Sequence, residues 1–208
     1  MVVKSASVDD SAAEAEIHPM KSPYAIIAYC SWLVLGLVWL PGYFMSKNTA
    51  NVPSLAMQIP ASALLAIGFV FLLSPWPRSL NVAVTPQDAF FGIIGVALDL
   101  AGVGFAIWAR LALGANWSGL VVTMKQAHEL VQTGPYALVR HPIYTGILLA
   151  MIGTALTRGT LASYIGVAAG FVAIMIRVGI EEQLMGNRFG EAHQTYRRRT
   201  WKLIPFVW

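Results

Sequence analysis

Long stretches without any charged residue constrain this chain more than any other feature of its sequence. No charge occurs from Tyr24 to Met45, and a second uncharged stretch is centred on 55–73. Each is long enough to cross the roughly 30 Å hydrocarbon core of a bilayer as a helix. Hydrophobic residues make up 57% of the 208 residues and charged residues only 12%, which is far fewer charges than soluble domains carry. The sequence therefore predicts an integral membrane protein.

Three further apolar segments bring the expected number of spans to about five. They run from Ala89 to Ala109, from Ile143 to Thr157 and from Leu161 to Ile180. Only a short connection at Arg158 and Gly159 separates the last two, which predicts a tight antiparallel helical hairpin. The expected fold class is therefore an all-α integral membrane protein with about five transmembrane helices, the last two forming a hairpin.

Small residues recur inside these spans and predict close approach between helices. The residues concerned are Gly92, Gly95, Gly102, Gly166 and Gly170. A single acid, Asp99, lies within the third span. Packing is the favoured interpretation of this acid, and a functional role remains open.

The distribution of basic residues predicts how the chain is oriented. Five spans place the termini on opposite sides, and most Lys and Arg residues, including Arg110, Arg140 and 197–202, then share one side. The positive-inside rule places that side, with the C-terminus and the 110–142 connection, in the cytoplasm. The acidic N-terminus is expected on the opposite side, together with Arg158.

Composition also predicts an organisation in three parts and excludes several classes of site. Residues 1–22 are expected to form a disordered acidic tail, and 23–109 are expected to anchor the chain with three helices. Residues 110–208 contain the polar segments in which a site is expected. Cys30 is the single cysteine, so an intrachain disulfide and a cysteine-based metal site are excluded. The histidines show no metal-ligand spacing, and the net charge of +4 suggests no nucleic-acid partner. Oligomeric state is not predicted.

The first polar segment, from His128 to Gly146, contains a turn followed by a helix start. Gly134-Pro135 breaks any helix. Pro142 favours the first helical position, which makes His141 the N-cap and places Tyr144 in the first turn. Taken alone, the sequence Arg140-His141-Pro142 is more typical of a basic membrane flank than of a site.

The second polar segment begins at Arg177, near the end of the last span. Arg177 and Glu181 are four residues apart and therefore share one helical face. An arginine at this depth is costly unless it is paired, and such residues usually face a bundle interior or a polar cavity. The alternative, given equal weight, is that the Arg177 side chain extends to the cytosolic interface.

Together these segments resemble the isoprenylcysteine carboxyl methyltransferase family, which is related to the phospholipid methyltransferases. The matching strings are His128-Glu129-Leu130-Val131, Gly134-Pro135-Tyr136, Arg140-His141-Pro142-Ile143-Tyr144-x-Gly146, Glu181-Glu182 and Phe189-Gly190. Their order and spacing also match, over about residues 110–205. The string LGANWSGLV at 113–121 resembles the bacterial branch of that family.

The resemblance implies an integral membrane enzyme that uses S-adenosylmethionine to methylate a lipophilic acceptor. Its cofactor would be held at the cytosolic face by the carboxyl-terminal half, 110–208. The implied cofactor contacts are His128, Glu129, Leu130, Val131, Tyr136, His141, Pro142, Ile143, Tyr144 and Glu181. The implied catalytic group is Arg177, Glu181 and Glu182, and the implied substrate contacts are Arg177, Asn116 and Trp117. The expected reaction is carboxyl O-methylation of a prenylcysteine-like substrate, without a metal, with membrane lipid as the surrounding partner.

The sequence departs from the family at one position, and it leaves three alternatives open. His193 stands where the family has the first tyrosine of an FGxxYxxY stretch, whereas Tyr196 retains the second. A phospholipid N-methyltransferase is the main alternative, followed by a nicotinamide-dependent sterol-type reductase and a non-enzymatic membrane scaffold. An amine or thiol acceptor would need a base such as Glu182, His128 or His141, whereas a carboxylate acceptor would not.

Overall fold

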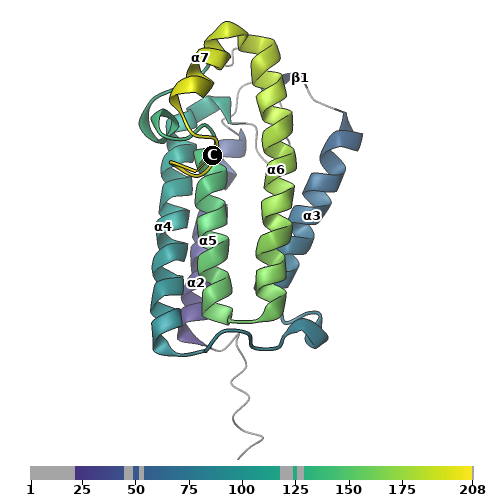
Figure 1. Cartoon of the computed structure of the whole chain (residues 1–208), viewed down its shortest axis with the longest axis vertical. Coiled ribbons are helices and arrows are strands. Elements are labelled where there is room, and N and C mark those ends of the chain that lie inside the picture. The colour runs from purple at the N-terminus through teal and green to yellow at the C-terminus, as the bar shows by residue number, and fades with distance from the viewer. Residues whose placement is uncertain (1–21, 45–48, 52–53, 118–123, 126–128, 208) are drawn as a thin grey trace, which may run out of the picture.

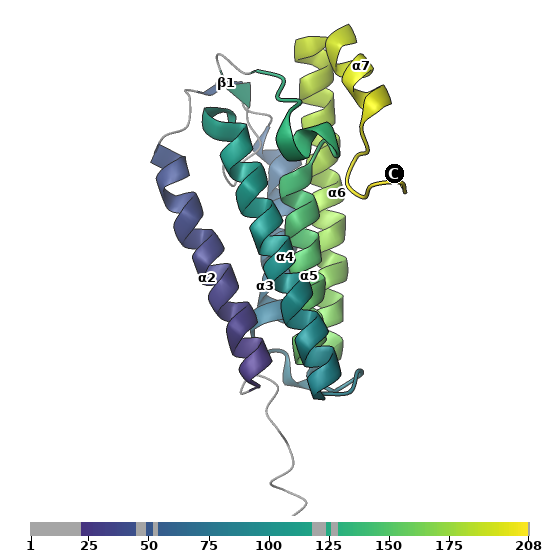
Figure 2. The ribbon, with the colours of Figure 1, turned by 90° about the vertical axis from the view of Figure 1, so that its left-hand side faces the viewer.

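Five long helices form the body of the protein in a computed structural model that describes residues 22–44, 49–51, 54–117, 124–125 and 129–207. The helices are α2 (Pro23–Phe44), α3 (Leu55–Leu73), α4 (Ala89–Leu113), α5 (Pro142–Arg158) and α6 (Leu161–Phe189). Figure 1 shows α4, α5, α6 and α3 side by side in that order, and Figure 2 shows α2 flanking α4. The predicted all-α fold is confirmed. The proposed N-terminal tail lies outside the described residues, apart from Ser22.

Short elements complete the two ends of the bundle. α7 (Glu191–Arg199) turns back over the end of α6, and the C-terminal segment then runs down beside α5 (Figure 2). Two short strands, β1 (Thr49–Asn51) and β2 (Met124–Lys125), pair in antiparallel fashion at the same end. No local sequence pattern predicted this pairing. In the described part of the chain, three 3-10 turns lie in the connections: η2 (Arg78–Leu80), η3 (Gly114–Asn116) and η4 (Gly134–Ala137).

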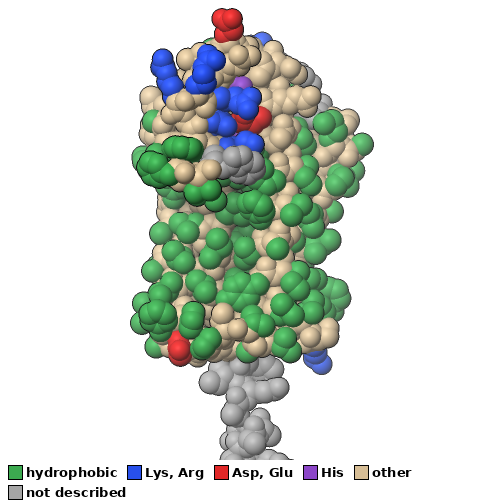
Figure 3. Space-filling view, in the orientation of Figure 1, with side chains coloured by type: hydrophobic (Ala, Val, Ile, Leu, Met, Phe, Trp, Pro, Cys, Tyr) green, Lys and Arg blue, Asp and Glu red, His purple; other side chains and the backbone are tan. Residues whose placement is uncertain are grey.

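Four of the described helices, α2, α3, α4 and α6, are long and apolar enough to cross a membrane. α5 has 17 residues, which at 1.5 Å per residue is a length of about 26 Å. It is also the central helix, with most of its side chains buried. On the face seen in Figure 3, a broad apolar band covers the middle of the bundle, and charged side chains gather at its ends. The protein is therefore an integral membrane protein whose hairpin contains one short, enclosed helix.

Close helix contacts occur in two pairs, α4 with α5 and α3 with α6. A Cβ atom added at Gly102 of α4 would overlap the backbone nitrogen of Ala150 in α5. A Cβ atom added at Gly68 of α3 would lie 2.9 Å from the carbonyl oxygen of Gly166 in α6. The expected use of Gly102 and Gly166 in close packing is thus confirmed.

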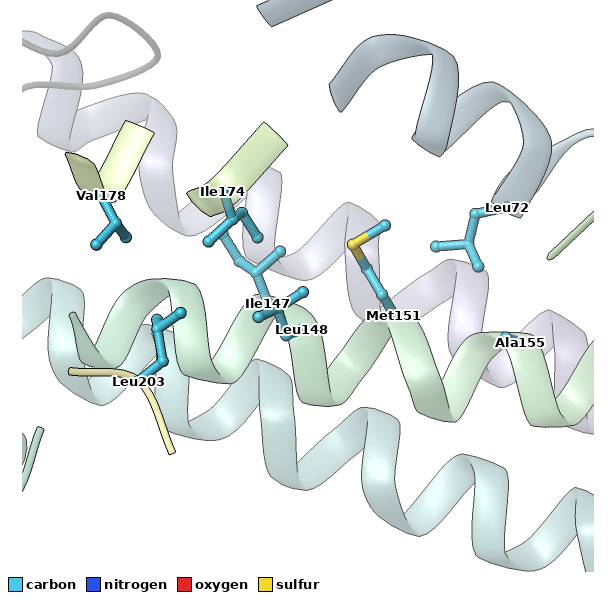
Figure 4. Packing of buried hydrophobic residues seen from close by; sticks show 8 residues of the cluster. All are labelled: Leu72, Ile147, Leu148, Met151, Ala155, Ile174, Val178 and Leu203. Carbon is cyan, nitrogen blue, oxygen red and sulfur yellow. The ribbon is translucent and has the colours of Figure 1, made fainter. Parts of the chain in front are cut away.

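Between α5 and α6, side chains rather than backbones make the contact. Figure 4 shows the buried cluster, in which Leu203 of the C-terminal segment lies at the Val178 end. Met151 of α5 contacts α6 at Gly170. The members are Leu72, Ile147, Leu148, Met151, Ala155, Ile174, Val178 and Leu203. At the α7 end of the bundle, polar side chains replace these apolar ones between the same two helices.

The opposite end of the hairpin contains a buried arginine. From the sequence, Arg158 is only a basic residue of the connection between two spans, but the structure buries it completely as the last residue of α5. Its Nη1 donates to the carbonyl oxygens of Phe71 and Leu72, and its Nη2 donates to Oδ1 of Asn81, 3.1 Å away. A guanidinium here satisfies the unpaired carbonyls at the C-terminal end of α3 and complements its dipole.

The intramembrane acid Asp99 joins three helices. Its carboxylate accepts hydrogen bonds from Ser31 of α2 and from Thr154 of α5, the latter at 2.9 Å. Trp32 of α2 donates its indole N–H to the same Thr154 hydroxyl at 2.8 Å. These contacts support the packing interpretation of Asp99.

The glycine contacts predict that alanine substitution affects stability very differently at two nearby positions of α4. Gly102→Ala should destabilise the protein by about 1–3 kcal/mol, because the new methyl group must displace the backbone of α5. Gly104 has nothing within 4 Å of an added Cβ, so Gly104→Ala should leave stability unchanged or slightly higher. Thermal unfolding of both variants in the same detergent measures this, and equal effects would contradict the packing account.

Candidate active site

The start of α5 presents His141 toward α6. Pro142 occupies the first turn and His141 is the N-cap, as predicted, but the imidazole does not cap its own helix. It instead lies between two consecutive carboxylates. His141 Nδ1 is 3.2 Å from Glu181 Oε2, and Nε2 is 3.0 Å from Glu182 Oε1. One buried histidine therefore holds both acids of α6.

Two further side chains extend this arrangement in opposite directions. The Tyr144 hydroxyl donates to Glu181 Oε1 at 2.6 Å, and it also interacts with the guanidinium of Arg177. On the other side, Arg140 Nε donates to Glu182 Oε1 at 2.8 Å. The result is a continuous chain of contacts that we call the polar network. Its members are Arg177, Tyr144, Glu181, His141, Glu182 and Arg140.

Arg177 lies at the membrane end of the polar network. It is buried, and its Nη2 donates to the Ser62 hydroxyl of α3 at 2.9 Å. Of the two interpretations for this residue, contact with the bundle interior is the one that the structure supports. Three helices, α3, α5 and α6, therefore surround the guanidinium.

The C-terminal segment fixes the other end of the polar network. Arg140 Nη1 donates to the Thr200 carbonyl at 2.6 Å, and the Arg140 backbone N–H donates to the Trp201 carbonyl at 2.8 Å. The backbone N–H of His141 donates to the Lys202 carbonyl at 3.2 Å. These contacts hold the first residues of α5 against the C-terminal segment.

The predicted turn at Gly134-Pro135 forms η4 and buries Tyr136 behind the network. The Tyr196 hydroxyl of α7 donates to the Tyr136 carbonyl at 2.7 Å. Burial raises the pKa of Tyr136, and the charge of Glu181 raises it further. Burial likewise raises the pKa of Tyr196. Both phenols therefore remain neutral hydrogen-bonding groups at physiological pH.

The two acids differ in exposure, which distinguishes what each can do. The Glu181 side chain is 27% exposed, whereas that of Glu182 is 12% exposed and forms ion pairs with Arg140 and Arg197. Burial alone would lower the pKa of His141, but hydrogen bonds and charges from Glu181 and Glu182 outweigh it and raise that pKa. Glu181 is therefore the carboxylate with a face left open to a ligand.

Of the other predicted cofactor residues, two belong to the start of α5. Pro142 is fully buried and Ile143 packs on the core cluster, so both position α5. Glu129, Leu130 and Val131 form an irregular segment, and His128 lies outside the described residues.

The predicted substrate contacts Asn116 and Trp117 lie where α4 ends. Asn116 Oδ1 accepts the backbone N–H of Glu129 at 3.3 Å. Trp117 stacks against the Arg110 guanidinium, 4.4 Å from the ring centroid, and packs on Trp39 of α2. Asn116 thus joins the predicted cofactor string at 129–131 to the end of α4.

His193 lies buried on α7 in place of the family tyrosine. Burial lowers its pKa, and the nearby charges of Arg197, Arg140 and His141 act in the same direction, against that of Glu182. The imidazole is therefore largely neutral near pH 7.

Two residues of the site, Arg140 and Arg197, were not assigned a role from the sequence. Both contact Glu182. The adjacency of Arg140 to His141 is the one sequence signal for its role, whereas Arg197 belongs to a basic run that is typical of a membrane flank.

Comparison with known proteins matches this part of the chain to a family. The family model of the phospholipid methyltransferases matches residues 90–192, which include the whole polar network. Residues 90–192 are thus similar to the phospholipid methyltransferases.

Several curated proteins that are similar to this chain are named as isoprenylcysteine methyltransferases. A protein-S-isoprenylcysteine O-methyltransferase from Xenopus laevis is 28% identical over 65% of this chain and 49% of its own length. A probable protein-S-isoprenylcysteine O-methyltransferase from Oryza sativa subsp. indica is 23% identical over 76% of this chain and 83% of its own length. A nickel-cobalt-cadmium resistance protein from Alcaligenes xylosoxydans xylosoxydans is 30% identical over 57% of this chain and 54% of its own length.

A solved structure of the eukaryotic intramembrane isoprenylcysteine carboxyl methyltransferase also matches. The TM-score is 0.48 with 25% sequence identity, over 76% of this chain and 55% of that one. The chain spans about half the length of the Xenopus relative. The family match and the curated relatives confirm the resemblance expected from the motifs.

The raised pKa of His141 predicts a pH dependence of stability. Protonated His141 binds both carboxylates, so its stabilisation is complete below about pH 6.5, the ordinary histidine pKa. It is lost as the pH rises through the raised pKa. The Tm of the wild type should therefore fall more between pH 6 and pH 9 than that of His141→Gln, and parallel pH profiles would contradict the assignment.

Proposed function

We propose that this protein is an S-adenosylmethionine-dependent methyltransferase that acts on a lipophilic acceptor at the membrane surface. One observation carries the proposal: the polar network connects a buried arginine among the membrane helices with a partly exposed carboxylate at the end of the bundle. Such a network serves two ligands, one that enters from the membrane and one that enters from water.

Glu181 fits the cationic part of the cofactor. Its carboxylate is fixed by Tyr144 and His141, and about a quarter of its side chain stays exposed. A fixed, acceptor-only group with an open face suits an ammonium group. Tyr136 and the 129–131 backbone would flank the same ligand. S-adenosylmethionine supplies an electrophilic methyl group on its sulfonium when bound.

Arg177 fits an acidic acceptor. A guanidinium presents a planar set of donors that matches a carboxylate in a bidentate contact, and burial strengthens such a contact. Ser62 and Tyr144 hold Arg177 from two helices, so the carboxylate would be aligned on binding. Alignment and exclusion of water are the main requirements of an in-line methyl transfer.

The polar network favours a carboxylate over an amine as acceptor. A carboxylate is already ionised, whereas a protonated amine must first lose a proton to a base. His141 has a raised pKa and lies between two acids, and Glu182 is bound by two arginines. Neither is a free base. We therefore infer carboxyl O-methylation of a prenylcysteine-like substrate as the reaction.

A phospholipid N-methyltransferase is the second candidate, because the matched family carries that description. Transfer of labelled methyl from S-adenosylmethionine distinguishes the two. Purified protein in lipid nanodiscs would be offered farnesylcysteine and, separately, extracted phospholipids. Base-labile label on farnesylcysteine supports O-methylation and base-stable label on lipid supports N-methylation. Absence of both, in protein that also fails to bind the cofactor, would refute the methyltransferase proposal.

Substitution of Arg177 should separate turnover from cofactor binding. Arg177→Ala should reduce turnover by about 100-fold or more, since an oriented charged contact to the acceptor is lost, while cofactor affinity stays within about twofold. Arg177→Lys should recover only part of the rate, because the bidentate geometry is lost. Arg188→Ala, an exposed arginine of the same helix, is the control. Equal losses of turnover and cofactor affinity would contradict this division of roles.

A further inference from the structure

A basic depression lies beside the polar network, where α7 ends and the C-terminal segment begins. Its volume is about 430 Å³, and it is lined by Arg140 and residues 197–202. Figure 3 shows Lys and Arg side chains gathered in this region, directly above the apolar band of the bundle. The proposed methyl transfer uses none of the exposed arginines of this depression.

The depression carries positive charge that the chain itself does not neutralise. Arg140 is bound to Glu182, and Arg197 forms an ion pair with the same acid while 52% of its side chain stays exposed. Arg198 and Arg199 are exposed, and no acid in the described part of the chain pairs with either. Closely spaced arginines with unused donors are the usual partners of phosphate groups.

The backbone of the depression is fixed rather than loose. The backbone of Trp201 forms a parallel β-bridge with that of Val139. The Thr145 hydroxyl donates a hydrogen bond to the Leu203 carbonyl at 2.6 Å. Leu203 itself is buried in the core cluster. Because the segment is anchored at both positions, its backbone does not have to be ordered when a ligand binds.

Apolar side chains border the depression along the same segment. Trp201, Ile204, Phe206 and Val207 are 38%, 45%, 83% and 72% exposed, and the rings of Trp201 and Phe206 lie 5.8 Å apart. Large exposed apolar groups next to a basic cluster are typical of a membrane interface. A free phosphate ion would use the arginines alone, whereas a phospholipid would use both features.

We propose that this depression binds the headgroup phosphate of an anionic phospholipid, with its acyl chains lying along Trp201 and Phe206. Arg198 and Arg199 contact the phosphate. Because Arg140 lines the depression and also holds Glu182, the bound lipid would adjoin the polar network. The inference stands whether or not the protein transfers methyl groups.

Native mass spectrometry of the full chain in detergent tests the proposal by counting bound lipids. Wild-type protein should retain phosphatidylglycerol in preference to phosphatidylcholine. Arg198→Gln/Arg199→Gln should weaken phosphatidylglycerol binding by about tenfold or more, since each basic residue near a lipid surface contributes appreciably. The charge-matched control is Arg78→Gln/Arg188→Gln, two exposed arginines outside the depression, which should bind like the wild type.

Two further arms separate a lipid site from a simple anion site. Phe206→Ser should also weaken phosphatidylglycerol binding, and millimolar inorganic phosphate should compete poorly with the lipid. Equal weakening by both arginine pairs, no preference for phosphatidylglycerol, or full competition by inorganic phosphate would each overturn the proposal. Circular dichroism and gel filtration of each variant establish that it is folded.

Discussion

The site depends on one physical constraint, the partial burial of two consecutive carboxylates on α6. Acids removed from water need hydrogen bonds and positive partners, or they destabilise the fold. Here Glu181 and Glu182 obtain them from His141, Tyr144 and Arg140, all at the start of α5. The requirements of the two acids therefore bring the 140–144 segment against α6, and Arg140 in turn binds the C-terminal segment.

Helix packing places this constraint where the membrane helices meet the α7 end of the bundle. Gly102 and Gly68 allow backbone contact within the pairs α4–α5 and α3–α6, whereas bulky side chains such as Met151 fill the space between α5 and α6. The polar network continues the same seam toward the end of the bundle. A buried arginine, Arg177, thus lies at the level of the membrane helices while Glu181 reaches solvent.

The sequence was sufficient for features that depend on local pattern. Hydropathy predicted the ends of the spans to within a few residues, with one exception. The last span was expected to end at Ile180, where polar residues begin, but α6 continues to Phe189. Proline and glycine chemistry predicted the start of α5 at Pro142 and the hairpin at Gly159. The resemblance grouped His141, Tyr144 and Glu181 in one site, but individual contacts between side chains far apart in sequence were not predicted. The burial of Arg158 against α3 and the contact of Arg140 with Glu182 depend on tertiary packing, which no local pattern encodes.

Direct binding of S-adenosylmethionine tests the central claim, that Glu181 is the carboxylate held open for a cationic ligand. Titration calorimetry on the purified full chain should show binding to the wild type and to Glu191→Gln, which removes an exposed acid of α7. Glu181→Gln keeps an oxygen acceptor for Tyr144 but loses the charge, so its affinity should fall by about 10- to 100-fold. Unchanged affinity in folded Glu181→Gln would contradict the account.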